Sequence, residues 1–259
     1  MRATMQRYTS RIIKAGAALD ETRTIIEYWD ARATTEENLR RIADENPLGK
    51  RSRVRLGDLI GLAIVPRYIA PGPHVIPALK GLLPDHRAFT EACYFEVTRA
   101  DRLVASFAEG PVWVWWHAGK TIITTSDVEE WLESQAKEGK TAMWSSSVRE
   151  RSAQGLLSAL RDFGVLRGAN RSPRKEIVSP AISPRGFAYA AWREHELGAS
   201  SRALVSTTTW RRWLLDPDEV ISMFDRVARL GLLRFSSAGS VVRIDWLARS
   251  LAEVTGAAA

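Results

Sequence analysis

The sequence of 259 residues contains a single cysteine, Cys93, and four scattered histidines. A lone cysteine cannot form an internal disulfide, and a structural zinc site needs about four closely spaced Cys or His ligands. Long apolar runs are also lacking, because the longest, near residues 59–65, is far shorter than the roughly 20 residues that cross a bilayer. These absences predict a cytoplasmic protein with neither a disulfide framework, a zinc module nor membrane contact.

Sequence motifs of catalysis are missing as well. The chain has no glycine-rich phosphate loop, no paired-carboxylate motif and no nucleophile elbow. We therefore expect no enzymatic activity, no catalytic residue, no bound metal and no cofactor. The composition, with 45% hydrophobic and 26% charged residues, is that of an ordinary globular protein.

Positive charge is in excess and unevenly placed. Lysine and arginine outnumber aspartate and glutamate by 37 to 30, and the pI is near 9.8, a balance typical of chains that bind nucleic acid. Residues 141–175 hold seven basic and two acidic side chains, and the sequence GKRSRVR at 49–55 is a second basic cluster. Residues 86–140 are acidic. Net charge alone also fits proteins that bind no polyanion, so the positions of the charges carry more weight.

The distribution of proline and apolar residues suggests the domain organisation. Five of the eleven prolines lie between residues 66 and 84, where a helix cannot easily continue, and this segment is interpreted as a connector. Before it, apolar residues recur at helical spacing, and Thr34 with Glu37 predicts a capping box. We predict a helical N-terminal domain (1–83) that ends in the connector, a middle domain (84–185) and a C-terminal unit (186–259).

The most informative pattern is an internal pseudo-repeat. Residues 156–178 read LLSALRDFGVLRGANRSPRKEIV, and residues 223–244 read MFDRVARLGLLRFSSAGSVVRI. Each copy is an amphipathic helix that ends at a glycine, Gly164 or Gly231, followed by an apolar pair, an arginine, a polar turn and a β-rich segment. A helix followed by a hairpin is the end of a winged helix-turn-helix. We therefore predict a mainly α fold, with winged-helix-like units and short β-hairpins after the helical N-terminal domain.

The helix of the first copy has the composition expected of a helix that reads DNA. At 100° per residue its apolar residues share one face, and the opposite face presents Ser147, Arg151, Gln154, Gly155 and Ser158. Short side chains permit close approach to a major groove, where arginine and glutamine can meet guanine and adenine edges. The alternative is a solvated surface helix beside a mobile basic loop, since winged-helix units also occur without DNA binding.

Basic residues around this helix complete a predicted interface with double-stranded DNA. Base contacts are expected from Arg151 and Gln154, with Ser147 and Ser158 on the same face. The residues expected to contact phosphates flank the helix or lie in the basic turn, residues 168–175, and are Arg149, Arg167, Arg171, Arg174 and Lys175. The cluster of Lys50, Arg51, Arg53 and Arg55 is either a second phosphate-contacting patch or, with equal weight, an ordinary basic helix start.

Other conspicuous residues are better explained by packing. Trp113, Trp115 and Trp116 lie in the acidic middle of the chain, whereas aromatic platforms for single strands adjoin cationic grooves, so core packing is favoured. Cys93 stands among apolar residues without a flanking cation, as a buried inert thiol does. The turn of the second copy, residues 236–240, has no charge, and this copy is expected to pack or to bind a partner.

Four stretches, in this order, resemble the BrxA family of bacterial BREX phage-defence loci. They are YTSRIIKAGAALDETRTIIEYW (8–29), ENPLGKRSRVR (45–55), MWSSSVRERSAQGLLSALRDFGVL (143–166) and WRRWLLDPDEVISMFDRVARLGLLRF (210–235). The resemblance implies a small non-enzymatic component that binds double-stranded DNA, and it implies an ATPase, a phosphatase-like protein and a DNA methyltransferase as further partners. The alternative is an interaction scaffold of the same defence complex whose winged-helix units dock other proteins.

Overall fold

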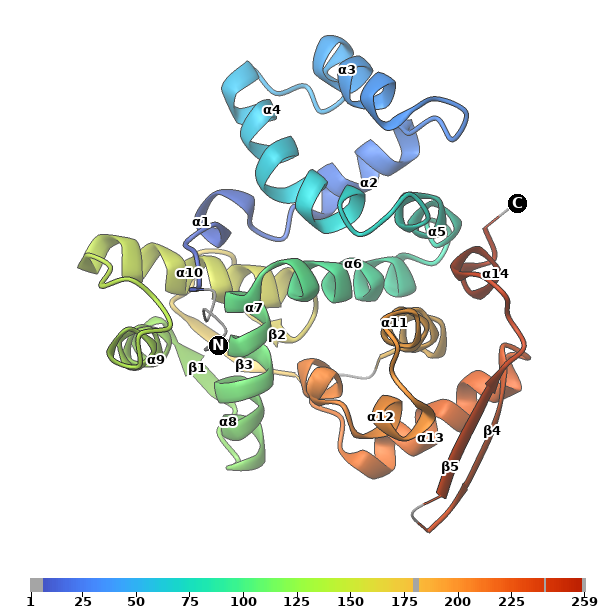
Figure 1. Cartoon of the computed structure of the whole chain (residues 1–259). Coiled ribbons are helices and arrows are strands. Elements are labelled where there is room, and N and C mark those ends of the chain that lie inside the picture. Colours follow the sequence, from blue (N-terminus) through green and yellow to red (C-terminus); the bar gives the residue numbers. More distant parts are fainter. Residues whose placement is uncertain (1–6, 179–181, 240, 258–259) are drawn as a thin grey trace, which may run out of the picture.

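A computed structural model describes residues 7–178, 182–239 and 241–257. The fold is mainly α, as predicted, with two small antiparallel sheets among the described residues. Figure 1 shows the helices grouped around α6 (His86–Ala100), which runs through the middle of the molecule. Nearly every residue of α6 from Ala88 to Thr98 is buried, because helices pack on several of its sides.

The N-terminal helices form a layer over one side of α6 (Figure 1). They are α1 (Ile12–Ala15), α2 (Leu19–Tyr28), α3 (Thr35–Glu45), α4 (Arg53–Leu59), the π-helical segment η1 (Ile60–Ile69) and α5 (Val75–Gly81). The capping box expected at the start of α3 is present: Glu37 N donates to Thr34 Oγ1 at 3.2 Å, and Thr34 N donates to Glu37 Oε2 at 2.7 Å. The N-terminal part is therefore helical, as its periodicity predicts.

The proline-rich segment differs from the expected irregular connector, because much of it is helical. Pro66 lies inside η1, and Pro77 is the third residue of α5. The amide groups of a first helical turn have no acceptor within the helix, so Pro77 costs no intrahelical hydrogen bond. Pro66 is the seventh residue of η1, so it does remove a backbone donor, and the helix there is π-helical rather than α-helical. Apolar residues of α5 are buried in the core, so the segment is part of the packed domain.

The first unit, β1 to β3, follows three short helical segments. These are α7 (Arg102–Phe107), the π-helical η2 (Ala108–Val112) and α8 (Trp113–His117). The unit itself consists of β1 (Ile122–Thr124), α9 (Thr125–Lys137), α10 (Ser146–Asp162), β2 (Leu166–Arg167) and β3 (Arg174–Ile177). Its strands form an antiparallel sheet in the order β1-β3-β2, in which Ile123 pairs with Lys175 and Leu166 with Ile177.

The second unit, α11 to β5, lies on the side of the molecule away from β1 and α9 (Figure 1). Its elements are α11 (Pro184–Glu196), α12 (Ser201–Ser206), the 3-10 helix η3 (Thr208–Trp213), α13 (Pro217–Arg229) and the hairpin β4 (Leu233–Ala238) with β5 (Val241–Trp246). The last helix, α14 (Leu251–Thr255), returns to contact α5 and α11. One hydrophobic core therefore runs through all three predicted domains, whose boundaries stay predictions.

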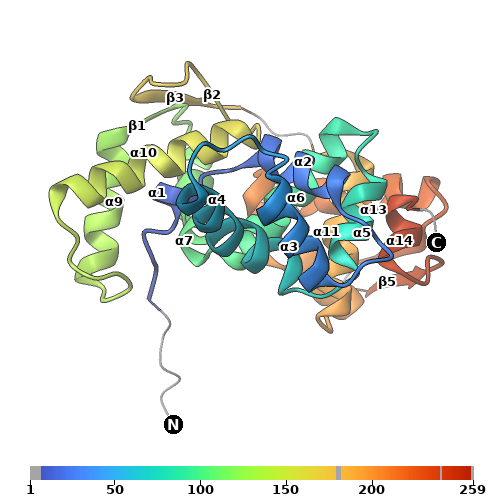
Figure 2. The same ribbon diagram turned by 90° about the horizontal axis from the view of Figure 1, so that it is seen from above.

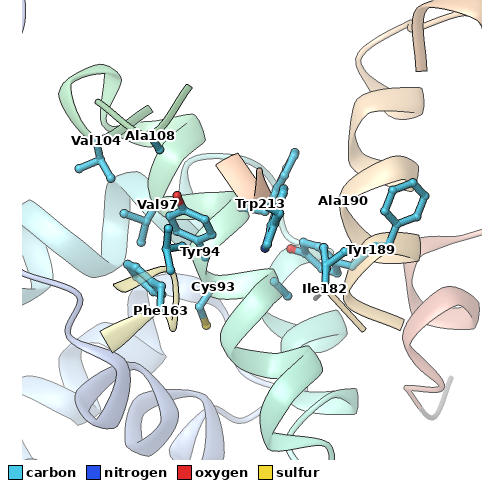
Figure 3. Packing of buried hydrophobic residues seen from close by; sticks show 14 of the residues in the cluster. Cys93, Tyr94, Val97, Val104, Ala108, Phe163, Ile182, Tyr189, Ala190 and Trp213 are labelled. Carbon is cyan, nitrogen blue, oxygen red and sulfur yellow. The ribbon is translucent and has the colours of Figure 1, made fainter. Parts of the chain in front are cut away.

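Aromatic contacts on α6 join the two units. Tyr94 stacks on Phe163, the residue after α10, with ring centroids 4.9 Å apart, and meets the edge of Trp213 from η3 at 5.4 Å. Figure 3 shows Phe163 and Trp213 on different sides of Tyr94, with Cys93 beside them. Such pairs stabilise by about 1 kcal/mol beyond the area that they bury. Both units are thus fixed to the same central helix.

A buried ion pair strengthens the attachment of α11 to α6. Glu96 is completely buried, and its carboxylate accepts hydrogen bonds from Arg193 Nε and Tyr189 Oη, each at 2.8 Å. Arg99 Nε donates to the other oxygen at 2.7 Å. Buried charges are tolerated only when they are paired and hydrogen-bonded, so this contact defines how the second unit sits on α6.

Candidate nucleic-acid interface

Helix α10 buries the face that its sequence predicts. Ser145 is the N-cap, and its hydroxyl accepts from Val148 N at 3.4 Å. The apolar residues predicted to face the core are all buried, and they are Ala153, Leu156, Leu157, Leu160 and Phe163. Helix α9 and the N-terminal α1 pack against the same helix. The core contacts of α10 leave a separate face toward solvent.

The solvent face of α10 carries the predicted base-contacting residues. Ser147, Arg151 and Gln154 are exposed, and Ser158 is half-buried. Arg151 Nε donates to Ser147 O at 3.3 Å, and Gln154 Nε2 donates to the carboxylate of exposed Glu150 at 3.1 Å. Glu150 was not singled out from the sequence. Its position four residues before Gln154 is the spacing that brings side chains together on a helix, and it could have been found from that spacing.

Gly155 differs from its expected place on the solvent face. It is half-buried beneath α1, and a Cβ built on it would lie 3.4 Å from the carbonyl oxygen of Ile12. Ser152, one turn earlier, is completely buried. The absence of a side chain at Gly155 therefore admits α1 against α10. Periodicity within α10 alone could not show this, because α1 comes from a segment about 140 residues away.

The basic turn projects at one edge of the molecule, next to α10 (Figure 2). Arg171 and Arg174 are exposed there, as a phosphate contact requires. Arg167 is exposed too, but its guanidinium forms an ion pair with Glu176 on the neighbouring strand at 2.8 Å. Such a solvent-exposed pair is weak, so Arg167 is restrained rather than removed from the surface.

Lys175 is buried, contrary to the expectation of a phosphate contact. Only 2% of the residue is exposed, and its Nζ donates to the carbonyl oxygens of Ala169 at 2.6 Å and Ser172 at 2.7 Å. Burial, with the charge of Arg161, lowers the pKa of the Lys175 ammonium. Lys175 and the buried Ile177 are two residues apart on β3. Because side chains of a strand point to the two faces in turn, both lie on the inner face of the sheet, and the sequence RKEI already contains this spacing.

A cavity of about 450 Å³ separates the solvent face of α10 from the basic turn. Seven of its nine lining residues are polar or charged, and the lining residues are Thr125, Gln154, Leu157, Ser158, Asn170, Arg171, Ser172, Pro173 and Lys175. The cavity brings Gln154 and Arg171 to one concave surface, although they come from different elements. The amide predicted to contact a base and a cation of the basic turn are thus adjacent in space.

Arg149 and the basic residues of the 49–55 cluster differ in their exposure and in their partners. Arg149 is half-buried, and its guanidinium donates to Trp144 O at 3.5 Å. Lys50 donates to Glu21 at 2.9 Å, which partly neutralises it. The arginines of the cluster, Arg51, Arg53 and Arg55, are exposed around the start of α4. The short helix α1 contacts both α4 and α10, so one small element connects the cluster to the first unit.

The second unit repeats the helix and hairpin but presents different surfaces. Helix α13 buries Val220, Met223, Phe224 and Val227, while Arg226 and Arg229 are exposed on it beside Asp225. The described residues at the end of the hairpin are uncharged, and Val241 is 69% exposed. The predicted turn includes residue 240, which lies outside the described residues.

The clustered tryptophans and the cysteine differ in how deeply they are buried. Trp113, Trp115 and Trp116 are half-buried and pack against the core from α8, whose Val114 is 59% exposed. Cys93 is completely buried, and burial raises the pKa of its thiol.

In the part of the chain that the structure describes, no group of His, Cys, Asp or Glu side chains has the arrangement of a metal site. None of the described helices combines the length and apolarity needed to cross a bilayer.

Comparison with known proteins identifies the family. The BrxA family profile matches residues 6–193, so the chain belongs to the BrxA family, which associates it with BREX phage defence. The match includes α10 and the basic turn but not α13 or the second hairpin. A crystal structure of an uncharacterized protein from Magnetospirillum magneticum is similar in fold, with a TM-score of 0.60 and 18% identity over 80% of this chain and 98% of that one. The curated proteins contain no match.

Proposed function

We propose that this chain is a non-enzymatic component of a BREX system that binds double-stranded DNA in the cytoplasm, with the first unit acting as a winged helix. The order β1, α9, α10, β2, basic turn, β3 is the strand and helix order of that module, with α10 as the recognition helix and the basic turn as the wing. Family membership supports the defence context.

One observation carries the proposal more than any other. The side chains of Arg151 and Gln154 stand on an uncovered face of α10, and across the adjoining cavity the basic turn exposes Arg171 and Arg174. A major groove, about 12 Å wide, presents base edges at its floor and phosphates along its rims, so an interface needs both kinds of side chain on one face. The helix therefore supplies contacts that distinguish bases, and the turn supplies contacts that hold the backbone.

A salt titration tests the phosphate contacts. Removal of one cation that binds a phosphate should reduce the slope of log K against log salt by about 0.9, so Arg171→Ala/Arg174→Ala should lower duplex affinity and reduce the slope by about 1.8. The matched control is Arg226→Ala/Arg229→Ala, which removes two exposed charges from α13 in the second unit. An unchanged slope in the first variant, or an equal reduction in the control, would contradict the proposal.

A second titration tests base reading and the choice of ligand. Arg151→Ala and Gln154→Ala should each cost about 1–3 kcal/mol on a preferred duplex and much less on random duplex. The preferred duplex is first selected from a random library with the unchanged protein. Single-stranded DNA and RNA duplex should bind more weakly, because the deep, narrow major groove of A-form RNA does not admit a helix. Equal loss on all sequences would reduce the role of α10 to backbone binding.

A docking role is the second candidate function, and it is favoured by the second unit. The uncharged end of the β4 and β5 hairpin and the exposed Val241 suit a protein partner better than a polyanion. The ATPase, phosphatase-like protein and methyltransferase of the same system are the partners to test. Co-purification that survives Arg171→Ala/Arg174→Ala but fails on Val241→Asp would assign docking to this hairpin. Magnesium-dependent cleavage of DNA by the purified chain would overturn the non-enzymatic assignment.

A further inference from the structure

We propose that Lys175 is a positioning residue, whose buried ammonium holds the basic turn in one conformation and thereby fixes Arg171 and Arg174 beside α10. The consequence for DNA rests on the proposed function, whereas the hold on the turn does not. This role differs from a phosphate contact, because a phosphate needs a cation at the surface.

The contacts of the ammonium lie within the turn. Its Nζ donates to Ala169 O at 2.6 Å and to Ser172 O at 2.7 Å, and Ala169 O also accepts from Ser172 N at 3.2 Å. Hydrogen bonds from a charged donor are stronger than neutral ones, and the donor of both is a residue that is only 2% exposed, although the carbonyls belong to residues nearer the surface. One cation therefore joins two carbonyl groups three residues apart. These carbonyls therefore point toward the buried ammonium.

The strand and the turn are shaped to admit the lysine stem. Lys175 pairs with Ile123 of β1, so β3 delivers the side chain from the inner face of the sheet. Gly168 has a φ of +148°, and a Cβ built there would lie 3.1 Å from Lys175 Cδ and 3.2 Å from Arg174 O. A side chain at position 168 would be strained and would press on the stem. The glycine lets the turn close over it.

Two further contacts tie the turn to the helices of the unit. Arg161 Nη1 of α10 donates to Asn170 Oδ1 at 2.8 Å, and Thr125 N of α9 donates to Pro173 O at 2.9 Å. With the lysine inside and both sides tied, the arginines of the turn remain exposed. A turn that is ordered before binding loses less conformational entropy on binding. Lys175 therefore acts on DNA through the turn.

Hydrogen exchange of the free protein tests the hold on the turn. Lys175→Met keeps the length of the stem and removes the donors, and exchange of the Ser172 amide, which donates to Ala169 O within the turn, should accelerate about tenfold or more, while other regions stay unchanged. Arg174→Met is the matched control, with the same charge change on an exposed neighbour, and should leave exchange as in the unchanged protein. Exchange that is equally slow in Lys175→Met would overturn the proposal.

Duplex titration then separates positioning from phosphate contact. Lys175→Met should bind several-fold more weakly with an unchanged salt slope, whereas Arg174→Met should reduce the slope by about 0.9. Gly168→Ala, which disturbs the turn and keeps every charge, should behave like Lys175→Met and serves if Lys175→Met fails to fold. A reduced slope with unchanged exchange in Lys175→Met would make Lys175 a phosphate contact. If the unchanged protein binds no duplex, the proposed function fails, and the exchange result still decides the role of Lys175.

Discussion

Removing the Glu96 carboxylate is expected to be among the most destabilising single changes in this chain. Glu96→Ala leaves Arg193, whose side chain is 4% exposed, with only the more exposed Glu196 as an ion-pair partner, and leaves Tyr189 Oη without an acceptor. Breaking a buried ion pair by removing one partner costs about 3–5 kcal/mol, because the remaining charge stays desolvated. For a chain of this size, that loss corresponds to a fall in Tm of roughly 6–10 °C.

The measurement is urea unfolding followed by tryptophan fluorescence, with Asp245→Ala as a control. Asp245 pairs with Arg243 on the surface of the second hairpin at 2.7 Å, and removing it should cost less than about 1 kcal/mol. The double variant Glu96→Ala/Arg193→Met should lose less than the two single variants together, since the buried charges are both removed and the groups that lose a partner, Arg99 and Glu196, are more exposed. A cost below about 1 kcal/mol for Glu96→Ala, or strict additivity in the double variant, would refute this account of the pair.

Two smaller changes test other assignments. Gly155→Ala places a methyl group at 3.4 Å or more from Ile12, so we expect up to about 1 kcal/mol of added stability and unchanged duplex affinity; weaker binding would return this position to the DNA-facing surface. The second change concerns the ion pair of Glu21 with Lys50. Burial raises the pKa of Glu21, but the hydrogen bond and the charge of Lys50 lower it more, so the pKa lies below its ordinary 4.5. This pair therefore stabilises the fold above that pH, and its contribution disappears as pH falls through the lowered pKa. Urea unfolding should show Glu21→Gln less stable by at most about 1 kcal/mol near neutral pH and no deficit in strong acid; a pH-independent deficit would contradict the pairing.

Local patterns predicted much of the fold. Helical spacing gave the buried face of α10, the Thr34 and Glu37 pair gave the start of α3, and the pseudo-repeat gave both hairpins. These features depend on residues within about one turn or one strand of each other, so sequence carries them directly. The helical state of the proline-rich segment was not predicted, because its outcome depends on where each proline falls in a helical turn.

The candidate site was predicted in part, and the errors share a cause. Exposure of Arg151, Gln154 and Arg171 agrees with the helical projection and with the charge of the turn, while their contact with DNA stays a prediction. Gly155 and Lys175 were both expected at the surface, Gly155 from the helical projection alone and Lys175 from its charge within a basic turn. Their actual surroundings come from α1 and from the turn folding back, and both depend on contacts beyond the local pattern.

The attachment of both units to α6 has a mechanical consequence. Phe163 and Trp213 hold opposite sides of Tyr94, and Glu96 clamps α11, so neither unit can swivel without breaking core contacts. A nucleic acid bound along α10 would therefore lie at a fixed distance from the β4 and β5 hairpin and in a fixed orientation to it. A protein bound to that hairpin would then be held at a constant number of base pairs from the site that α10 contacts.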